Sequence, residues 1–494
     1  MNEQLTGLSV RTRLLKGVFW SAVEKYSSQI SSILVSMVLA RLLSPKEFGI
    51  VAIATIILNF LSIFSTMGLG PAIIQRKDLE QPDYNSIFSF SLYLGLGLFI
   101  LLFMSAGLIA NYYGNGQLVN IVRIISVNVF LVAVNVVPNA LMYKNQRFKE
   151  IAKRTLVIQV ITGPISIAAA YLGCGAYSLL ISPVATAIFI FVYNIHIYPC
   201  AFKIRFSFKA VRKIISYSTF QFLFEVSNYF SRNLDKLIIG KTLSQTDLGY
   251  YDKSYRLMQL PLNNVSSVLG PVIQPVFSYL QDDKEQLAEK YNRIIKLLAT
   301  IGFPLGVFLA YSGYEIIYIL FGQQWLAAVS SFGILAYSIP IQLMLGTSGS
   351  IFQSASATKN LFLAGLRNTL IVVIGFVIAA VNFKTIESFA IAWTICEVIV
   401  FFSSYIDLYC FVLKSSLWKM MKVLLYPILY GIVLLLVFYF IRFPDNALMS
   451  LLLKALITIV VTLCLIQLFH QYEIIGMARK YFKKSKHNND SSDT

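Results

Sequence analysis

Charged and amide side chains recur at helical spacing within an otherwise apolar stretch of the sequence. The set comprises Glu225, Asn228, Arg232, Asp235 and Lys236. Residues three or four positions apart lie on one face of an α-helix, so these side chains form a polar stripe. Ionisable groups inside a membrane span are costly and are functional candidates by default. We therefore expect the stripe to face a water-filled interior rather than lipid.

A second stripe follows in the next apolar stretch. Its members are Asp252, Lys253, Arg256, Gln259 and Asn263, and positions 252, 256, 259 and 263 share one helical face. One arginine side chain can donate two parallel hydrogen bonds to the oxygens of a phosphate group. The cations of the two stripes therefore suit an anionic ligand.

A third polar group lies near the start of the chain, where Glu24 and Lys25 are accompanied by serines on one side of the expected helix. Glu24 and Glu225 are mid-span carboxylates and are therefore candidates for binding a coupling H⁺ or Na⁺. The alternative for each is a salt bridge, to Lys25 or to Arg232.

Internal ion pairing is an alternative for four more of these charges. Asp235 and Lys236 flank one side of the 241–247 turn, and Asp252 and Lys253 flank the other at similar depth. These four side chains either pair across a helical hairpin or line the interior, and both interpretations stay open.

Four other ionisable residues in expected spans have no charged neighbour in the sequence. They are Arg123, Glu397, Asp407 and Lys454. Packing contacts or snorkelling to the membrane interface explain such isolated charges most simply.

The elements that hold these stripes must be membrane helices. The 494 residues are 57% hydrophobic and 13% charged, with a mean hydropathy of +0.70; soluble domains have roughly 45–50% apolar and about 25% charged residues. Apolar runs such as 428–440 and 451–469 are continuous, which favours helices over the alternating strands of a membrane β-barrel. We predict an all-α polytopic membrane protein. The five cysteines are scattered and show no metal-binding spacing, so we expect no metal and no disulfide framework.

The sequence contains fourteen candidate spans. They are 15–40, 48–72, 86–110, 118–142, 155–172, 176–198, 214–240, 248–278, 294–313, 326–352, 361–381, 388–411, 423–441 and 447–470. With the N-terminus inside, 29 lysines and arginines fall in inner segments and five in outer ones. This asymmetry satisfies the positive-inside rule and predicts that both termini are cytoplasmic. The net charge of +18 therefore reflects topology, and we expect no nucleic-acid partner.

Two phrases occur twice in the chain at an offset of 200 residues. RLLSPKEFG at 41–49 matches KTLSQTDLG at 241–249, and LGP at 69–71 recurs at 269–271. Serine before an acid is typical of a helix start, so the first phrase predicts a turn that leads into the next helix. Because six spans separate the copies, both lie on the outer face, as in a parallel repeat.

This repeat predicts two six-helix lobes followed by two extra helices. The expected divisions are an N-terminal lobe at 1–200, a cytoplasmic interlobe elbow at 201–215, a C-terminal lobe at 216–411, two further transmembrane helices at 412–472 and a basic, disordered cytoplasmic tail at 473–494. The aromatic and basic residues of the elbow suit the headgroup region of the membrane.

Five stretches carry a further pattern. They read GVFWSAVEK (17–25), VLARLLSPKEFGIVA (38–52), GLGPAIIQ (68–75), NLDKLIIGKTLSQTDLGYY (233–251) and LFGQQW (320–325). These stretches resemble the polysaccharide exporters of the multidrug/oligosaccharidyl-lipid/polysaccharide superfamily, in particular the colanic-acid and teichuronic-acid exporters and the O-antigen flippases. The resemblance extends over essentially the whole chain.

The resemblance implies a multi-pass protein of the bacterial cytoplasmic (inner) membrane. Such a protein moves undecaprenyl-diphosphate-linked oligosaccharide from the inner to the outer leaflet for cell-surface polysaccharide biosynthesis, by alternating access around a cavity between two lobes. The expected partners are this substrate, membrane lipids, a coupling H⁺ or Na⁺ and a polysaccharide polymerase. It implies a transporter rather than an enzyme and no cofactor.

This function suggests a role for each polar residue. The diphosphate would be bound by cations (Lys25, Arg232, Lys236, Lys253 and Arg256), and the sugars by amides (Asn228, Gln259 and Asn263). Ion coupling would fall to the carboxylates (Glu24, Glu225, Asp235 and Asp252).

The sequence leaves other functions open. A small-molecule or multidrug exporter of the same superfamily is the nearest alternative. The loop QRKDLEQPDYN between the second and third spans lacks the Gly-rich Asp-Arg pattern of major-facilitator transporters. A membrane polysaccharide polymerase or ligase usually carries a large outer loop with catalytic residues. Here the outer connections are short, and His196, His470 and His487 do not cluster.

Overall fold

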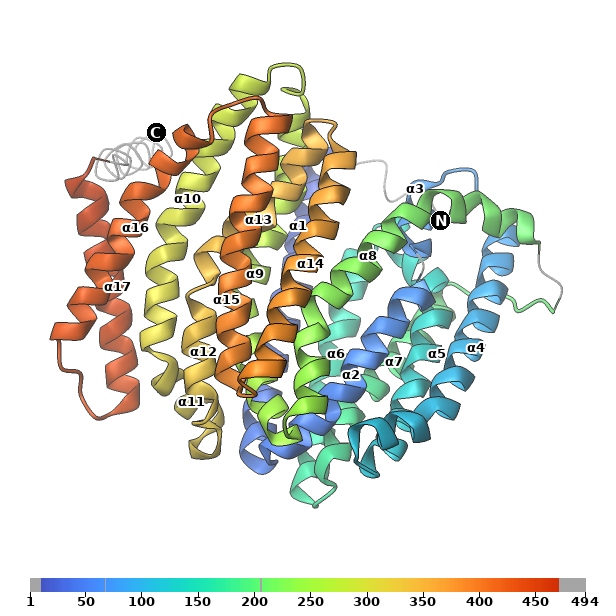
Figure 1. The fold of residues 1–494 in the computed structure, drawn as a ribbon. Coiled ribbons are helices and arrows are strands. Elements are labelled where there is room, and N and C mark those ends of the chain that lie inside the picture. Colours follow the sequence, from blue (N-terminus) through green and yellow to red (C-terminus); the bar gives the residue numbers. More distant parts are fainter. Residues whose placement is uncertain (1–9, 67, 205–206, 471–494) are drawn as a thin grey trace, which may run out of the picture. The chain divides into compact units, whose positions relative to one another are not determined.

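The computed structural model describes residues 10–66, 68–204 and 207–470, and every regular element within them is helical (Figure 1). The expected all-α fold is thus confirmed for these residues. The proposed tail at 473–494 and two residues of the proposed elbow, 205 and 206, lie outside the described residues.

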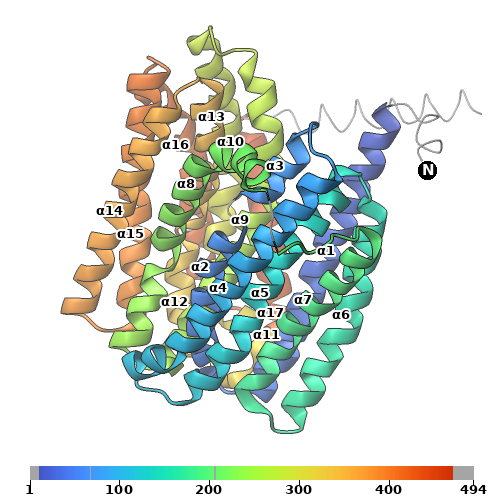
Figure 2. The ribbon, with the colours of Figure 1, turned by 90° about the vertical axis from the view of Figure 1, so that its right-hand side faces the viewer.

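The described residues form two compact units. The first comprises Met1–Lys253, Leu320–Trp325 and Val373–Phe389, as far as these are described. Its helices are α1 (Val10–Leu42), α2 (Pro45–Thr66), α3 (Leu69–Gln75), α4 (Gln81–Tyr113), α5 (Gln117–Lys144), α6 (Phe148–Tyr171), the short 3₁₀ helix η2 (Gly175–Tyr177), α7 (Ser178–Ile197), α8 (Phe208–Thr242) and the beginning of α9 (Gln245–Ser278). Within it α4 packs beside α5 (Figure 2), α1 packs on α6, and α8 contacts α2, α3 and α4.

The second unit comprises Ser254–Ile319, Leu326–Val372 and the described part of Ala390–Thr494. The remaining helices, three of which also enter the first unit, are α10 (Lys284–Tyr311), α11 (Gly313–Phe321), α12 (Ala328–Ala336), α13 (Ile339–Ser354), α14 (Thr358–Asn382), α15 (Ile386–Ile406), the π-helix η4 (Asp407–Val412), α16 (Leu417–Phe440) and α17 (Ala447–Leu468). The 3₁₀ helix η3 (Gln323–Trp325) belongs to the first unit. In the second unit α10 packs against α13 and α16, and α16 lies beside α17 (Figure 1).

Ten of the described helical segments are long and apolar enough to cross a membrane, and an eleventh is formed by α12 and α13 if that pair, bent by 52°, is one span. The expectation of a polytopic membrane protein is thus confirmed. Three further helices, α1, α8 and α9, have 33, 35 and 34 residues. At 1.5 Å per residue each extends about 50 Å, more than the thickness of a bilayer core. These three helices carry the polar groups described above and are not among the apolar segments.

The repeated phrase forms a capping box in both of its copies, as predicted. The Ser44 amide donates to Glu47 Oε2 at 2.7 Å, and the Glu47 amide donates to Ser44 Oγ at 3.4 Å. The Ser244 amide donates to Asp247 Oδ2 at 3.2 Å, and the Asp247 amide donates to Ser244 Oγ at 3.0 Å. Each box satisfies amide groups that a helix start leaves without an intrahelical partner.

The segment between α7 and α8 is held along α4. The Ala201 amide donates to Asn85 Oδ1 and the Lys203 amide to Ser89 Oγ, both at 2.9 Å. Because Asn85 and Ser89 are one helical turn apart, α4 offers a regular row of acceptors to an extended chain. Phe202 remains exposed beside this row.

Candidate functional site

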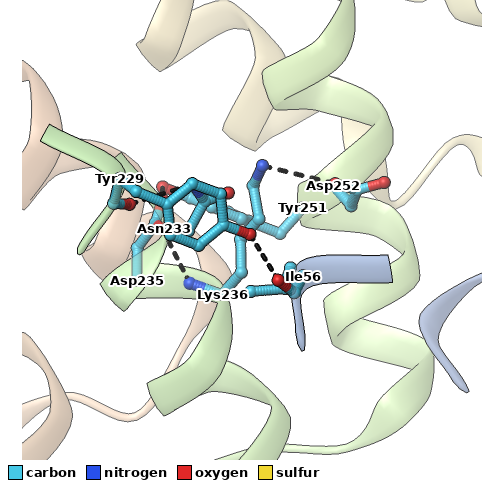
Figure 3. A network of polar contacts seen from close by, with 7 residues as sticks. All are labelled: Ile56, Tyr229, Asn233, Asp235, Lys236, Tyr251 and Asp252. Atoms are coloured by element: carbon cyan, nitrogen blue, oxygen red, sulfur yellow. Dashed lines mark hydrogen bonds and ion pairs between the residues drawn. The ribbon is translucent and has the colours of Figure 1, made fainter. Parts of the chain in front are cut away.

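The α8–α9 hairpin contains a buried ion pair. Lys236 Nζ on α8 lies 3.4 Å from Asp252 Oδ1 on α9 (Figure 3). The two residues are 7% and 6% exposed. The sequence left two interpretations for these side chains, pairing across the hairpin or lining the interior. In the structure Lys236 and Asp252 pair across the hairpin. Such a pair offsets the large cost of burying each charge.

Asp235 lies beside this pair and is fully buried. Its carboxylate accepts a hydrogen bond from the Tyr251 hydroxyl at 2.9 Å and one from the Lys236 amide at 2.8 Å (Figure 3). Nearly two turns towards the start of α8, the Tyr229 hydroxyl donates to the carbonyl of Ile56 on α2 at 2.5 Å. The network thus ties α8 to both α9 and α2.

Lys253, next to Asp252, points to a different neighbour. Its Nζ donates to Ser36 Oγ on α1 at 2.6 Å, and the residue is 5% exposed. Ser36 is the position that matches Lys236 in the 200-residue repeat. The polar residues of the second hairpin thus reach the first helix of the chain.

The other polar residues of α8 and α9 are accessible. Asn228 and Arg232 are exposed on α8, one helical turn apart, and Arg256 and Asn263 are exposed on α9. Gln259 is half-buried. Each stripe therefore divides into a buried part next to the α8–α9 turn and an accessible part beyond it. The side chain of Glu225 lies outside the described side chains.

Glu24 and Lys25 are half-buried on α1. Thr155 Oγ1 on α6 donates to Glu24 Oε1 at 3.4 Å, and one turn further along Gln159 Nε2 donates to Ser28 Oγ at 2.6 Å. The helices α1 and α6 thus meet through two polar rungs. The side-chain amide oxygen of Gln159, Oε1, is buried without a hydrogen-bond partner in the described structure.

A buried arginine lies next to these rungs and was missed by the sequence analysis. Arg154 on α6 is 6% exposed and donates to Asn194 Oδ1 on α7. Asn194 Nδ2 in turn donates to Asn135 Oδ1 at 2.9 Å and Asn139 Oδ1 at 3.2 Å on α5. Four helices of the first unit therefore share one polar interior.

A sequence signal for this interior was present. Thr155, Gln159, Thr162 and Ser166 recur at helical spacing within one expected span, which is the pattern of a polar helix face. Arg154 was assigned to the inner connection because it lies at the margin of that span. The asparagines of α5 gave a signal of the same kind, since Asn135 and Asn139 are four positions apart and share one helical face.

Two of the charges that the sequence analysis treated as isolated have partners. Lys454 on α17 lies 2.5 Å from Glu315 Oε1 on α11 and is 6% exposed. Arg367 on α14 lies 2.7 Å from Asp407 at the start of the π-helix. Snorkelling was therefore the wrong explanation for Lys454. The sequence could not reveal its partner, because Glu315 lies 139 positions away and beyond the end of an expected span.

Across residues 10–66, 68–204 and 207–470, no three histidine, cysteine, aspartate or glutamate side chains are placed to hold a metal ion. The arrangement instead offers exposed cations and amides on long polar helices. These groups can bind an anionic, hydroxyl-rich ligand through charge-assisted hydrogen bonds.

Comparison with known proteins gives a family match. Residues 38–330 match a family described as "Polysaccharide biosynthesis protein". A Klebsiella pneumoniae relative named "Uncharacterized membrane protein in cps region" is 23% identical over 414 residues, covering 81% of this chain and 82% of the relative. The teichuronic acid biosynthesis protein TuaB of Bacillus subtilis is 24% identical over 348 residues, covering 69% of this chain and 71% of the relative.

The fold is also similar to a solved structure. The lipid II flippase MurJ in an inward closed conformation superposes with a TM-score of 0.75 at 17% identity, covering 92% of this chain and 99% of that one. At this level of identity the likeness concerns the fold.

Proposed function

Because this chain belongs to the polysaccharide biosynthesis protein family matched over residues 38–330, we propose that it is a lipid-linked oligosaccharide flippase. Its substrate is an undecaprenyl-diphosphate-linked repeat unit, which it moves across the bacterial cytoplasmic membrane for cell-surface polysaccharide assembly. The protein transports this substrate unchanged and is not an enzyme. A small-molecule exporter has no comparable support, since the curated relatives carry polysaccharide names.

One observation carries this proposal beyond family membership. Arg232 is exposed on α8, a helix of 35 residues, and within the described residues it has no ion-pair partner. An accessible, unneutralised cation on a helix of this length is expensive unless it meets an anion during function. Arginine is suited to the role, because its fork of donors can bind phosphate oxygens in pairs.

The membrane arrangement follows from the same helices. We assign α1, α8 and α9 as spans in addition to the apolar ones, which gives fourteen with both termini in the cytoplasm. The expected lobes at 1–200 and 216–411, the elbow between them and the two last helices are part of this proposal. The polar stripes then lie on the first helix of each lobe and on the helix that follows in the second lobe.

The substrate-binding residues divide by accessibility. Arg232, Arg256 and Lys25 supply cations for the diphosphate, and the sugars are bound by amides (Asn228, Gln259 and Asn263). Lys236 and Lys253 were included in this set from the sequence, but their burial and their partners favour a structural role. Asp235 and Asp252 would likewise hold the hairpin rather than couple transport to an ion.

Ion coupling is assigned to Glu24 in the first unit. A carboxylate, two hydroxyls and an amide oxygen, from Glu24, Thr155, Ser28 and Gln159, are oxygen donors of the kind that Na⁺ prefers. The carboxylate can equally carry H⁺. Glu225 is the second candidate by its place in the sequence.

The experiment is complementation of a bacterial strain that lacks its own flippase, in the presence of the native polysaccharide gene set. The wild-type chain should restore surface polymer, and Arg232→Gln should not, although it reaches the membrane at wild-type level. Lys290→Gln, a change to an exposed residue of α10, is the control and should restore polymer. Normal polymer from Arg232→Gln would refute the cationic site.

A further inference from the structure

The two copies of the repeated turn are in direct contact within the first unit. A Cβ atom added at Gly49 would lie 1.7 Å from the carbonyl oxygen of Gln245, and one added at Gly249 would lie 2.0 Å from the carbonyl oxygen of Pro45. The α1–α2 turn and the α8–α9 turn thus meet backbone to backbone.

A lysine side chain fastens the contact from one side. Lys253 Nζ lies 4.0 Å from the ring centre of Phe48 on α2, 5.0 Å from that of Phe321 and 5.8 Å from that of Trp325. Its hydrogen bond to Ser36 joins it to α1 as well. A cation enclosed by aromatic faces is held by cation–π attraction, which is strongest when water is excluded.

The segment 320–325 closes over the end of α1. Gln324 Nε2 donates to the carbonyl of Ala40 at 2.5 Å and to that of Leu43 at 3.2 Å. The indole of Trp325 also donates to the Ala40 carbonyl, at 2.8 Å. The last carbonyls of a helix have no partner within it, so this segment caps α1.

The α8–α9 turn is fastened on its other side to the end of α4. Lys241 Nζ donates to the Tyr112 carbonyl at 2.5 Å and lies 4.4 Å from the centre of its ring. Asn115 Nδ2 donates to Gln245 Oε1 at 3.0 Å. Lys241 is exposed and the two amides are half-buried, so water can take over each of these bonds when they part.

We propose that these contacts form an outer latch, which holds the α8–α9 turn against α1, α2 and α4 and opens once in every transport cycle. Lys253 is its fastening residue and contributes by gating, not by binding the substrate. The contacts of the latch are of kinds that can break and re-form. They are the backbone contacts at two glycines, hydrogen bonds to carbonyls at helix ends, and one lysine side chain enclosed by aromatic rings. The proposal rests on the proposed function for its assignment to transport.

The first test is a reversible cross-link in the full-length protein, with the five native cysteines replaced. Asn115→Cys and Gln245→Cys are joined by a short bifunctional methanethiosulfonate. Because a gate that cannot open stops turnover, transport into proteoliposomes should fall by about tenfold or more and recover on reduction. The control pair, Glu289→Cys and Arg293→Cys, lies within α10 alone and should leave transport unchanged when linked. Full transport with the latch linked would overturn the proposal.

The second test does not depend on transport. Ser36→Cys is exposed to a membrane-impermeant maleimide added outside intact cells, with Lys253 present or changed to Ala or Arg. Labelling should rise severalfold with Lys253→Ala and less with Lys253→Arg, which keeps a cation for the aromatic rings. Equal labelling of all three proteins would overturn the proposal. If the protein carries a different cargo, the transport assay fails for every variant while this difference in labelling persists.

Discussion

Gly49 and Gly249 occupy the same position in the two copies of the repeat, and each approaches the backbone of the other copy. The contact is reciprocal: Gly49 meets Gln245, and Gly249 meets Pro45, the residue that corresponds to Gln245. Reciprocity of this kind is the mark of a two-fold relation between equivalent surfaces. The repeated phrase therefore combines a helix-capping signal with a glycine whose lack of a side chain permits the approach.

Adding a methyl group at this contact should destabilise the protein. In Gly49→Ala or Gly249→Ala the new Cβ would overlap a carbonyl oxygen, so the two turns must separate, at a cost of at least about 1–3 kcal/mol. Thermal unfolding of the purified protein in detergent should show a lower midpoint for both variants. Gly97→Ala on α4 is the matched control, since nothing lies within 4 Å of its added Cβ. A normal midpoint for Gly249→Ala would show that the turns do not touch.

The Lys236–Asp252 pair can be distinguished from a substrate site by its response to single and double changes. Lys236→Met leaves the Asp252 carboxylate buried without its partner, which should cost about 3–5 kcal/mol of stability. Adding Asp252→Leu removes that uncompensated charge and should recover most of the loss. The measurement is the midpoint of thermal unfolding together with the yield of folded protein.

A substrate ligand would behave differently at the same positions. Lys236→Met would then abolish transport without any loss of stability, and the double variant would stay inactive. That outcome would return Lys236 to the substrate-binding set predicted from the sequence.

The accessible arginines should show the opposite pattern. Arg232→Gln and Arg256→Gln should lose surface polymer while keeping the wild-type unfolding midpoint, because neither side chain is buried. Arg123→Gln is the matched control: Arg123 is also exposed on a spanning helix, but it stacks 4.9 Å from the Phe103 ring outside the polar stripes. Polymer length and quantity at the cell surface provide the readout. Equal loss in all three variants would point to a general effect of removing charge.

The native cysteines offer a test of topology. Cys174 is exposed in the turn between α6 and α7, and Cys200 lies next to the segment held along α4. In the proposed arrangement Cys174 is outside and Cys200 is in the cytoplasm. A membrane-impermeant maleimide should therefore label a Cys174-only variant in intact cells and leave a Cys200-only variant unlabelled. The reverse pattern would invert the topology.

Cys200 should also react slowly after the cells are opened. Burial raises the pKa of its thiol to about 11, so the reactive thiolate accumulates only as the pH rises towards that value. With such a pKa about one thiol in a thousand is ionised at pH 8. Its labelling rate in permeabilised cells should increase about tenfold for each pH unit between 8 and 10. A rate that levels off near pH 8.5 would indicate an ordinary, solvated thiol.

Much of the architecture could be predicted because it depends on local chemistry. Long apolar segments specify spans, and a serine followed three residues later by an acid specifies a helix start. The capping boxes at Ser44 and Ser244 were therefore predictable from a few adjacent residues. The polar stripes of α8 and α9 were equally visible, since helical spacing alone reveals a shared face.

The partners of the charges could not be predicted in the same way. Lys236 and Lys253 belong to adjacent stripes, yet one meets Asp252 and the other a serine on α1. Which partner each lysine contacts depends on how α1 and α9 are rotated about their helix axes. The periodicity of the sequence gives no information about that rotation. The burial of Arg154 was overlooked for a related reason: its partner, Asn194, comes from another helix.

Transport of the lipid-linked oligosaccharide is tested most directly by reconstitution. Purified protein is placed in liposomes with a fluorescent undecaprenyl-diphosphate-linked oligosaccharide, and a membrane-impermeant glycan-oxidising or glycosidase reagent reports which leaflet holds the sugar. The wild-type protein should make the inner-leaflet pool accessible from outside, and Arg232→Gln should not. If the inner pool stays protected with wild-type protein, or if the oligosaccharide is polymerised instead of moved, the flippase assignment is contradicted.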